Sequence, residues 1–172
     1  MEPKLEPVIV VDKDDNQLQI SPRAAVESDT GKIIRYVYVL LYNHEGQLLL
    51  QRRHADLLRF PNYWEVSAAG AVRPEESYPD AALRLLQDEL GVSLPLNHER
   101  RSVIFIPEKA SRLTAVFIGK VEDIANISPN KVKVSEIRWL HPEEGLKGYL
   151  LTASCEDVLE WWRKHADDLM KT

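Results

Sequence analysis

The sequence is poor in the features that mark secreted and membrane proteins. Its single cysteine, Cys155, excludes an intrachain disulfide and a cysteine-rich zinc site. Its longest apolar run, residues 36–42, is far too short to cross a bilayer. The first residues, MEPKLE, are too acidic for a signal peptide and have no apolar core behind them. We therefore expect a cytoplasmic protein.

Basic residues are also outnumbered by acidic ones. Lysine and arginine total 22, whereas aspartate and glutamate total 27, which gives a net charge of −5. Because the chain has no concentrated basic block, neither a nucleic acid nor a membrane surface is expected as a partner. A small anion can still bind such a chain where a metal ion or a local group of arginines supplies the positive charge.

Length and composition predict one domain over residues 1–172, which includes the N-terminal segment 1–32 and a C-terminal helix. Apolar patterning predicts the secondary structure. The predicted strands are 8–11, 17–20, 33–42, 47–52, 63–69, 103–106, 113–121 and 137–140, the predicted helices are 77–90, 142–149 and 154–170, and residues 21–32 are predicted to be a loop. Strands and helices without regular alternation indicate the α/β class, with a mixed sheet that carries helices on its faces.

The clearest predicted helix lies between Ser77 and Gly91. Ser77 can cap its N-terminus, with Asp80 three residues later as in a capping box. Gly91 is typical of the residue that ends a helix. The predicted buried stripe consists of Ala82, Leu83, Leu86 and Leu90.

Residues 70–92 combine a glycine with several carboxylates and carry most of the chemical information in the chain. Gly70 ends a predicted strand, Glu76 follows in a loop, and the helix presents Arg84, Asp88 and Glu89. Carboxylates that converge at one end of a sheet can hold Mg²⁺ or Mn²⁺, and the glycine lets phosphate groups approach the backbone. Metal, phosphate and water together indicate hydrolysis of a phosphoanhydride. The alternative is a solvated acidic helix face in which Arg84 pairs with Asp88.

The spacing in this segment resembles the Nudix box. That pattern is a glycine, five residues, a glutamate, seven residues, Arg-Glu, an aliphatic residue, any residue, Glu-Glu, any residue, a glycine and an aliphatic residue. The positions in register are Gly70, Glu76, Arg84, Leu86, Glu89, Gly91 and Val92. Upstream, LLLQRRHADLLRFPNYWEVSAAG resembles the Nudix branch related to isopentenyl-diphosphate isomerase. The resemblance covers about residues 8–140 and implies a Nudix-type α/β/α sandwich with a mixed β-sheet.

The resemblance also implies a hydrolase that uses Mg²⁺ or Mn²⁺. Glu89, Asp88 and Arg84 are the implied catalytic residues, with Arg84 orienting the carboxylates, and Glu89, Asp88 and Glu76 are the implied metal ligands. This chain departs from the pattern at Leu85, where the family has a glutamate that binds metal and helps to activate water. It also departs at Asp88, whose side chain is shorter than glutamate by about 1.5 Å. Because leucine offers no lone pair, we expect a slow enzyme.

Isomerisation is excluded within the same resemblance. The isomerase branch uses a cysteine just beyond the PNYW segment and a histidine shortly after it, where this chain has Ala68 and Ala71. The branch implies that Arg53 contacts a diphosphate, and we expect Arg59 and Gly70 to contribute to the same binding site. Arginine suits phosphate because it can donate two parallel hydrogen bonds. The alternative for Arg53 and Arg59 is a solvated strand end.

A general base could also come from another loop, and Glu65, Glu108 and Glu136 are the candidates, each alternatively an ordinary surface residue. We expect a Nudix-type hydrolase that slowly cleaves a diphosphate linkage in a nucleoside diphosphate derivative or a related small molecule. The second hypothesis is a diphosphate-binding or sensor module without turnover. The third is an interaction protein that uses the C-terminal helix, capped by Ser154, whose adjacent tryptophans at 161 and 162 belong to the core or to a homodimer contact.

Overall fold

The computed structural model describes residues 5–104, 109–143 and 146–171. In chain order its elements are β1 (Pro7–Val11), β2 (Gln17–Pro22), α1 (Arg23–Val26), β3 (Ile33–Tyr42), β4 (Leu48–Arg53), β5 (Trp64–Glu65), β6 (Ala68–Ala71), α2 (Tyr78–Leu90), β7 (Asn97–Ile104), β8 (Ser111–Lys120), a 3₁₀ turn (Ile124–Asn126), β9 (Val134–Leu140) and α3 (Ala153–Leu169).

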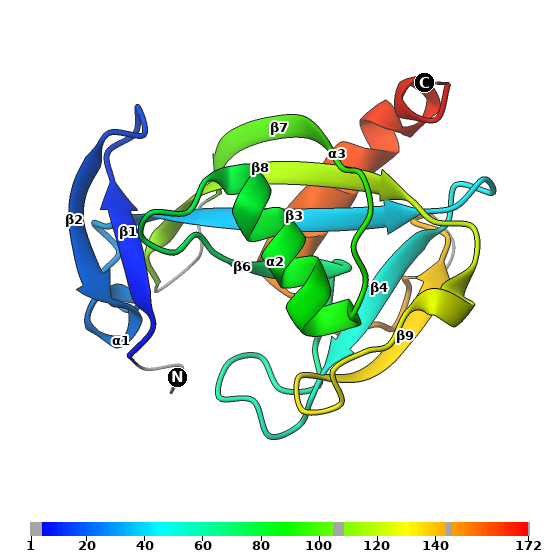
Figure 1. Cartoon of the computed structure of the whole chain (residues 1–172), viewed down its shortest axis with the longest axis horizontal. Coiled ribbons are helices and arrows are strands. Elements are labelled where there is room, and N and C mark those ends of the chain that lie inside the picture. Colours follow the sequence, from blue (N-terminus) through cyan, green and yellow to red (C-terminus); the bar gives the residue numbers. More distant parts are fainter. Residues whose placement is uncertain (1–4, 105–108, 144–145, 172) are drawn as a thin grey trace.

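Strand β3 is the centre of one mixed sheet (Figure 1). It pairs antiparallel with β1, β4 and β6, and it pairs with β8 in parallel from Ile33 opposite Ser111 to Tyr42 opposite Lys120. Strand β2 lies beyond β1, β7 lies beyond β8, and β5 and β9 both pair with β4. The predicted α/β class and mixed sheet are confirmed.

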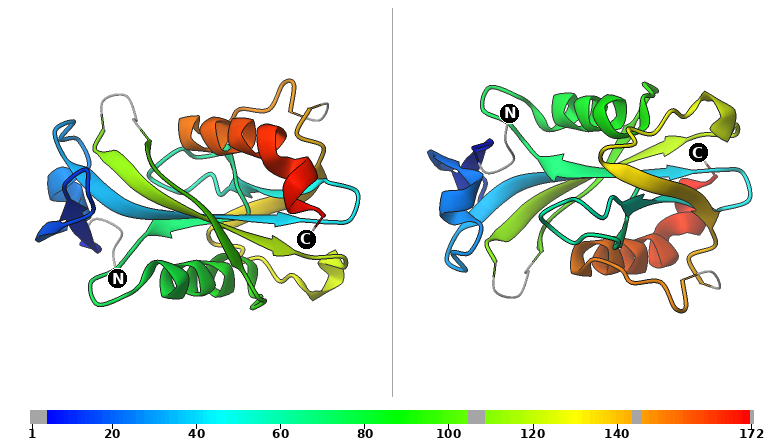
Figure 2. Two further views of the ribbon diagram at one scale, coloured as in Figure 1. Left: turned by 90° about the horizontal axis from the view of Figure 1, so that it is seen from above. Right: turned by 90° about the horizontal axis from the view of Figure 1, so that it is seen from below.

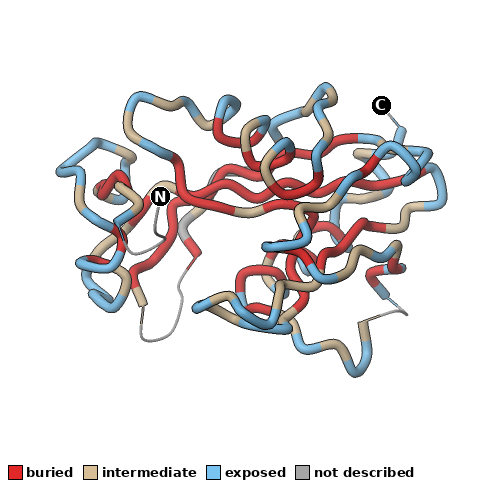
Figure 3. Tube along the Cα trace, turned by 60° about the horizontal axis from the view of Figure 1, so that its bottom comes forward, coloured by how far each residue is buried: buried red, intermediate tan, exposed pale blue. Residues whose placement is uncertain are grey.

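Helices α2 and α3 cover opposite faces of this sheet (Figure 2). Successive side chains of β3 explain how both faces are apolar, because neighbours along a strand point to opposite sides. Val37 and Val39 belong to the core beneath α2, whereas Tyr38 and Leu40 belong to the core beneath α3. A strand buried on both faces reads as a continuous apolar run, and Figure 3 shows this central strand buried along most of its length. The predicted three-layer sandwich is therefore confirmed.

Helix α2 begins and ends where the sequence predicts. Ser77 Oγ accepts a hydrogen bond from the Asp80 backbone N at 3.2 Å, and the return bond from Ser77 N to Asp80 Oδ2 measures 3.3 Å. Gly91 adopts a left-handed conformation with φ 63°. The predicted buried stripe is wrong at Leu83, which is 41% exposed, because it falls beside the helix face that packs on the sheet. Leu85, on the other flank of that face, is buried instead.

The predicted strand at 63–69 is two short strands, because Ser67 interrupts the pairing. Leu41 N donates a hydrogen bond of 2.8 Å to Ser67 Oγ, and this hydroxyl donates one of 2.6 Å to the Leu49 carbonyl. The side chain thus bridges β3 and β4 where the two strands separate. As a result β5 pairs with β4, whereas β6 pairs with β3.

Several predicted boundaries also differ from the structure. The predicted loop 21–32 contains the short helix α1, which is stabilised by an ion pair between Arg23 and Glu27 one turn apart. Residues 142–143 and 146–149 form turns rather than the predicted helix. Thr152, not Ser154, caps α3, since its Oγ1 accepts a hydrogen bond from Cys155 N at 3.1 Å. Strand β7 begins earlier than predicted, and residues 105–106 lie outside the described residues.

The tryptophans of α3 are explained by packing within this chain. Trp162 is fully buried and its ring centroid lies 5.3 Å from that of Tyr42. Trp161 is half-buried and stacks on His165. Within the described ranges, none of the helices has both the length and the apolar character needed to cross a membrane.

Candidate active site

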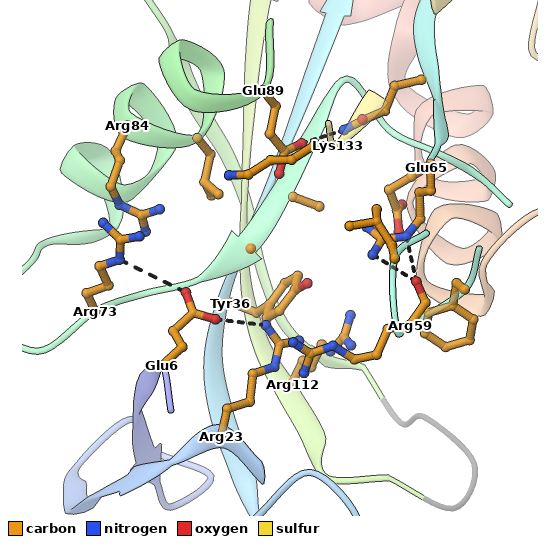
Figure 4. A pocket seen from close by; sticks show the side chains of 17 residues that line it. Glu6, Arg23, Tyr36, Arg59, Glu65, Arg73, Arg84, Glu89, Arg112 and Lys133 are labelled. Atoms are coloured by element: carbon orange, nitrogen blue, oxygen red, sulfur yellow. Dashed lines mark hydrogen bonds and ion pairs between the residues drawn. The ribbon is translucent and has the colours of Figure 1, made fainter. Parts of the chain in front are cut away.

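A pocket of about 220 Å³ lies between α2, strand β6 and the loop that joins β4 to β5 (Figure 4). Positive charge dominates its lining in the part of the chain that the structure describes. The cationic side chains that line it are Arg23, Arg53, Arg59, Arg73, Arg84, Arg112 and Lys133, and the carboxylates are Glu6, Glu65 and Glu89. Guanidinium groups are suited to bind phosphate oxygens, so this lining favours a phosphate-containing ligand.

One wall of the pocket is formed by Gly70 of β6 and by Leu85 and Glu89 of α2. The two helix residues are one turn apart and therefore point the same way. Leu85 packs directly on Gly70, because a Cβ built on this glycine would lie 2.4 Å from Leu85 Cδ2. The structural reason for glycine at this position is thus the close approach of the helix side chain. Phosphate contact with its backbone remains a prediction.

Glu89 faces the pocket from a buried position, with 8% of its surface exposed. Its carboxylate accepts a hydrogen bond from the Gln51 side chain, whose Nε2 also donates to the Ser67 carbonyl at 3.2 Å. Burial raises the pKa of Glu89 to about 7, against the opposing effects of the Gln51 hydrogen bond and the charges of Lys133 and Arg53. A carboxyl group with such a pKa can accept a proton near neutral pH.

Glu76 is engaged by Arg84 rather than directed at the pocket. Arg84 Nε and Nη2 bind its two carboxylate oxygens at 2.6 and 2.9 Å, and Nη2 also donates to the Ala71 carbonyl at 3.0 Å. The Arg73 backbone N donates a further hydrogen bond of 3.0 Å to Glu76. Burial opposes ionisation of Glu76, but the hydrogen bonds from Arg84 and Arg73 hold its pKa below the ordinary value.

Asp88 lies one residue from Glu89 but outside the pocket lining. Its side chain is 39% exposed, and its Oδ2 is 3.9 Å from Arg84 Nη1. Arg84 therefore contacts Glu76 closely and Asp88 at longer range. This part of the helix matches the alternative in which an acidic face is paired with arginine.

The carboxylates expected to hold a divalent metal are not brought together. Across residues 5–104, 109–143 and 146–171, no group of three potential metal-ligating side chains was found. Of Glu89, Asp88 and Glu76, only Glu89 lines the pocket, because α2 turns Asp88 outward and Arg84 binds Glu76. The structure thus places one of the three predicted metal ligands in the pocket, and the three-carboxylate set stays a prediction.

Arg53 and Arg59 both line the pocket, as the sequence led us to expect. Arg53 Nε and Nη2 donate to the Arg59 carbonyl at 3.0 and 2.9 Å, so Arg53 fixes the loop between β4 and β5. The same loop holds Phe60 at φ 49°, a conformation that costs a non-glycine residue about 1–2 kcal/mol. The side chain of Arg59 itself donates a hydrogen bond of 3.0 Å to Glu27.

Other pocket residues were missed by sequence reasoning. Arg23 comes from α1, and Arg112 is a charged residue near the start of β8, a strand that is buried along nearly all of its length. Arg112 Nη1 donates to the Tyr38 hydroxyl at 3.0 Å, and its guanidinium lies 4.0 Å from the ring centroid of Tyr36. The sequence signal that could have identified Arg112 was a charged residue at the start of a strand rich in apolar residues, because arginine is seldom fully buried without a partner.

The three alternative general bases lie in different surroundings. Glu65 lines the pocket and is buried, contrary to a surface role, with hydrogen bonds from Thr152 Oγ1 at 2.7 Å and from the Val66 backbone N at 3.0 Å. Burial raises its pKa. Glu136 is outside the pocket lining and pairs with Arg138. Glu108 lies outside the described residues.

A mixed sheet between two helices defines an α/β protein, and its guanidinium-rich pocket is suited to a phosphate-containing ligand. Comparison with known proteins narrows that class. The NUDIX domain family matches residues 32–161, which is most of the chain. The chain therefore belongs to the Nudix family, whose hydrolases generally use divalent metal ions and act on small diphosphate substrates.

Individual relatives agree with this membership. An uncharacterized Nudix hydrolase of Pseudomonas aeruginosa is 33% identical over 157 residues, which cover 91% of each protein. An isopentenyl-diphosphate Delta-isomerase of Nocardia farcinica is 32% identical over 146 residues, covering 80% of this chain and 81% of the relative. A crystal structure from Deinococcus radiodurans shares the fold with a TM-score of 0.77 at 24% identity, over 91% of this chain and 98% of that one. The predicted resemblance to the isomerase-related branch is confirmed.

Proposed function

We propose that this protein binds a small diphosphate compound in the arginine-rich pocket and slowly hydrolyses its diphosphate linkage. One observation carries the proposal: Glu89 faces a pocket whose other lining charges are mainly positive. Arg53 and Lys133 lie close enough to influence the charge of Glu89 and are suited to bind the phosphate oxygens near it. Family membership supports hydrolysis as the reaction.

In this reaction the oxygen of a water molecule forms a bond to one phosphorus, and the bond from that phosphorus to the bridging oxygen breaks. Glu89 accepts the proton that the attacking water loses. The leaving phosphate retains the bridging oxygen and takes up a proton from solvent. The pocket cations neutralise the charge that develops on the phosphate oxygens, which is a large contribution in a site shielded from water.

The rate is expected to be low because the box supplies a single carboxylate to the pocket. Leu85 occupies the position where the family has another carboxylate, and it packs on Gly70. Magnesium in phosphate-processing sites is held by one or two carboxylates together with the substrate phosphates. With Glu89 alone, the protein without substrate is expected to bind Mg²⁺ or Mn²⁺ weakly, and which ion supports activity remains a prediction.

A second candidate function is diphosphate binding without turnover, as in a sensor module. The packing of Leu85 on Gly70 favours it, because an apolar side chain fills the place from which a carboxylate would act. This candidate requires the same arginine-rich pocket. It differs from the first only in the fate of the bound ligand.

The test measures binding and turnover on the same purified protein. Calorimetry with a panel of nucleoside diphosphate derivatives and short alkyl diphosphates gives the affinity, and phosphorus NMR with added Mg²⁺ or Mn²⁺ gives the products. Binding with slow release of a phosphomonoester supports the proposal. Binding without release supports the sensor module, and a folded protein that binds no diphosphate contradicts both functions.

A further inference from the structure

Three arginines from separate parts of the chain share one carboxylate at an end of the pocket. Arg23 comes from α1, Arg59 from the loop between β4 and β5, and Arg112 from β8. Glu27 Oε2 accepts hydrogen bonds from Arg23 Nε at 2.7 Å and from Arg59 Nη1 at 3.0 Å, and its Oε1 is 4.0 Å from Arg112 Nη2. We call Arg23, Arg59 and Arg112 the arginine triad.

The charges of the arginine triad are only partly balanced by the described residues. Glu27 supplies one negative charge, and Glu6 adds a contact to Arg23 at 3.4 Å. Burial opposes ionisation of Glu27, but the surrounding arginines hold its pKa below the ordinary value. Burial and the charge of Arg23 lower the pKa of Arg59, whereas Tyr36 and Glu27 raise the pKa values of Arg23 and Arg112 against the opposing effect of burial. Two carboxylates therefore accompany three guanidinium groups.

The donor groups of the arginine triad are also incompletely used. Arg112 is buried, and among the described residues its Nε has no hydrogen-bond partner. Arg59 is the most accessible member, with 24% of its side chain exposed, against 7% for Arg23 and 5% for Arg112. Its remaining guanidinium donors are thus available from the pocket. A buried charged group with unused donors is costly unless a ligand completes its hydrogen bonds.

The arginine triad and Glu89 of the Nudix box lie at opposite ends of the pocket (Figure 4). Glu89 and Lys133 are at one end, whereas the guanidinium groups of Arg23, Arg59 and Arg112 gather at the other, beside Tyr36. The ring of Tyr36 packs against Arg23 and Arg112, with their guanidinium carbons 5.5 and 4.0 Å from its centroid. A ligand that spans the pocket would meet cations at both ends.

We propose that the arginine triad binds a second anionic group of the ligand, so that the preferred ligand is a compact diphosphate that carries a separate phosphate. This inference rests on the proposed function, because it places the diphosphate at the Glu89 end. An apolar tail at the triad would remove the hydration of charged guanidinium groups without replacing their hydrogen bonds, which is unfavourable. A phosphate restores those bonds and offsets the excess positive charge.

The test compares two ligands that differ at one end. Isopentenyl diphosphate carries an apolar tail, whereas 5-phosphoribosyl 1-diphosphate carries a diphosphate and a separate phosphate. Calorimetry in EDTA, which suppresses turnover, measures both affinities. We expect the unmodified protein to bind the two-phosphate ligand about tenfold or more tightly than it binds isopentenyl diphosphate. One additional hydrogen-bonded contact to a charged group supplies a difference in affinity of this size.

The variant Arg59→Gln removes the accessible charge of the triad, whereas its backbone carbonyl still binds Arg53. We expect it to weaken the affinity for the two-phosphate ligand about tenfold or more and to change the affinity for isopentenyl diphosphate by less than about threefold. Arg138→Gln, at an exposed arginine outside the pocket lining, is the matched control and should change neither affinity. Circular dichroism and thermal unfolding of each variant establish that it is folded.

The possible outcomes separate this inference from the proposed function. Equal affinities of the unmodified protein for the two ligands overturn the second-phosphate site and leave diphosphate binding intact. A folded Arg59→Gln variant that loses the same fraction of its affinity for both ligands also overturns the second-phosphate site. If the folded protein binds neither of these ligands but binds another diphosphate of the panel, the inference alone is contradicted; if it binds no diphosphate at all, the proposed function fails as well.

Discussion

The two ends of the pocket are equipped very differently. At the box end Leu85 packs on Gly70, and Arg84 forms an ion pair with Glu76. Glu89 is the single box carboxylate that faces the pocket. At the other end three arginines from distant segments converge on Glu27. In the proposed function, binding of the second anionic group and activation of water depend on different residues. The comparison teaches that this pocket keeps a positively charged lining although a single box carboxylate faces it.

The largest expected effect is a difference in hydrolysis rate between variants of the two adjacent carboxylates of α2. Replacing Glu89 by glutamine should lower the rate of diphosphate hydrolysis about a hundredfold or more, because it removes the proton acceptor. Asp88→Asn is the matched control, and it should change the rate by less than about threefold since Asp88 lies outside the pocket lining. Single-turnover kinetics measures both, and equal losses in the two variants would contradict the assignment of roles.

The buried position of Glu89 should also appear in the stability of the protein. Its pKa is about 7 in the folded protein against an ordinary 4.5, so the folded state binds this proton more tightly than the unfolded state. The contribution of the group to stability is fully present below pH 4.5 and is lost as pH rises to about 7. Relative to Glu89→Gln, the free energy of unfolding should fall by about 3 kcal/mol between about pH 4 and 8.

Chemical denaturation across this pH range, with EDTA present, measures the difference between the two proteins. Other titrating groups are common to both and cancel in the comparison. A difference that does not change with pH would show that Glu89 is solvated in the folded protein.

The packing of the box can be tested by adding one methyl group. Gly70→Ala would place its Cβ 2.4 Å from Leu85 Cδ2, so the leucine must move, at a cost of about 1–3 kcal/mol in the free energy of unfolding. The double variant Gly70→Ala/Leu85→Ala should lose less than the sum of the two single changes, because the clash disappears. Strictly additive losses in urea unfolding would mean that the two residues are not in contact.

The smallest expected effect concerns Glu76 as a partner of Arg84. Glu76→Gln should lower the free energy of unfolding by about 1 kcal/mol, since it weakens a paired hydrogen-bonded contact at the edge of the pocket. It should leave the Mn²⁺ affinity, measured by electron paramagnetic resonance, within about twofold of the unmodified protein. A large loss of Mn²⁺ binding would restore Glu76 as a metal ligand.

Much of the fold could be predicted because local signals agreed with the final packing. The apolar run of β3, in which nine of ten residues are apolar, and the Ser77–Asp80 cap of α2 are read directly from the sequence. The prediction of a loop at 21–32 missed α1, because this helix is a single turn and its stabilising ion pair between Arg23 and Glu27 leaves no longer helical pattern in the sequence. Ser67 broke a predicted strand through hydrogen bonds to residues far along the chain, which no local pattern reveals.

The site was predicted less completely, for a similar reason. The spacing of the box placed Glu89, Arg84 and Glu76 on one segment. Which carboxylate lines the pocket depends on the direction in which the helix points each side chain and on the ion pair between Arg84 and Glu76. The arginine triad was not predicted, because its members come from segments that meet only in the folded sheet. Arg112 directly precedes the predicted strand 113–121 and could have been noticed as a charge at the start of a strand rich in apolar residues.

The claim that turnover is limited by the missing box carboxylate is tested most directly at Leu85. Leu85→Glu adds a carboxylate beside Glu89 and Gly70, and Leu85→Gln supplies the same shape without the charge. In the presence of Mg²⁺, the account predicts that Leu85→Glu raises kcat by about tenfold or more, whereas Leu85→Gln does not. Equal rates in the unmodified protein and in both variants, with all three folded and binding diphosphate, would contradict it.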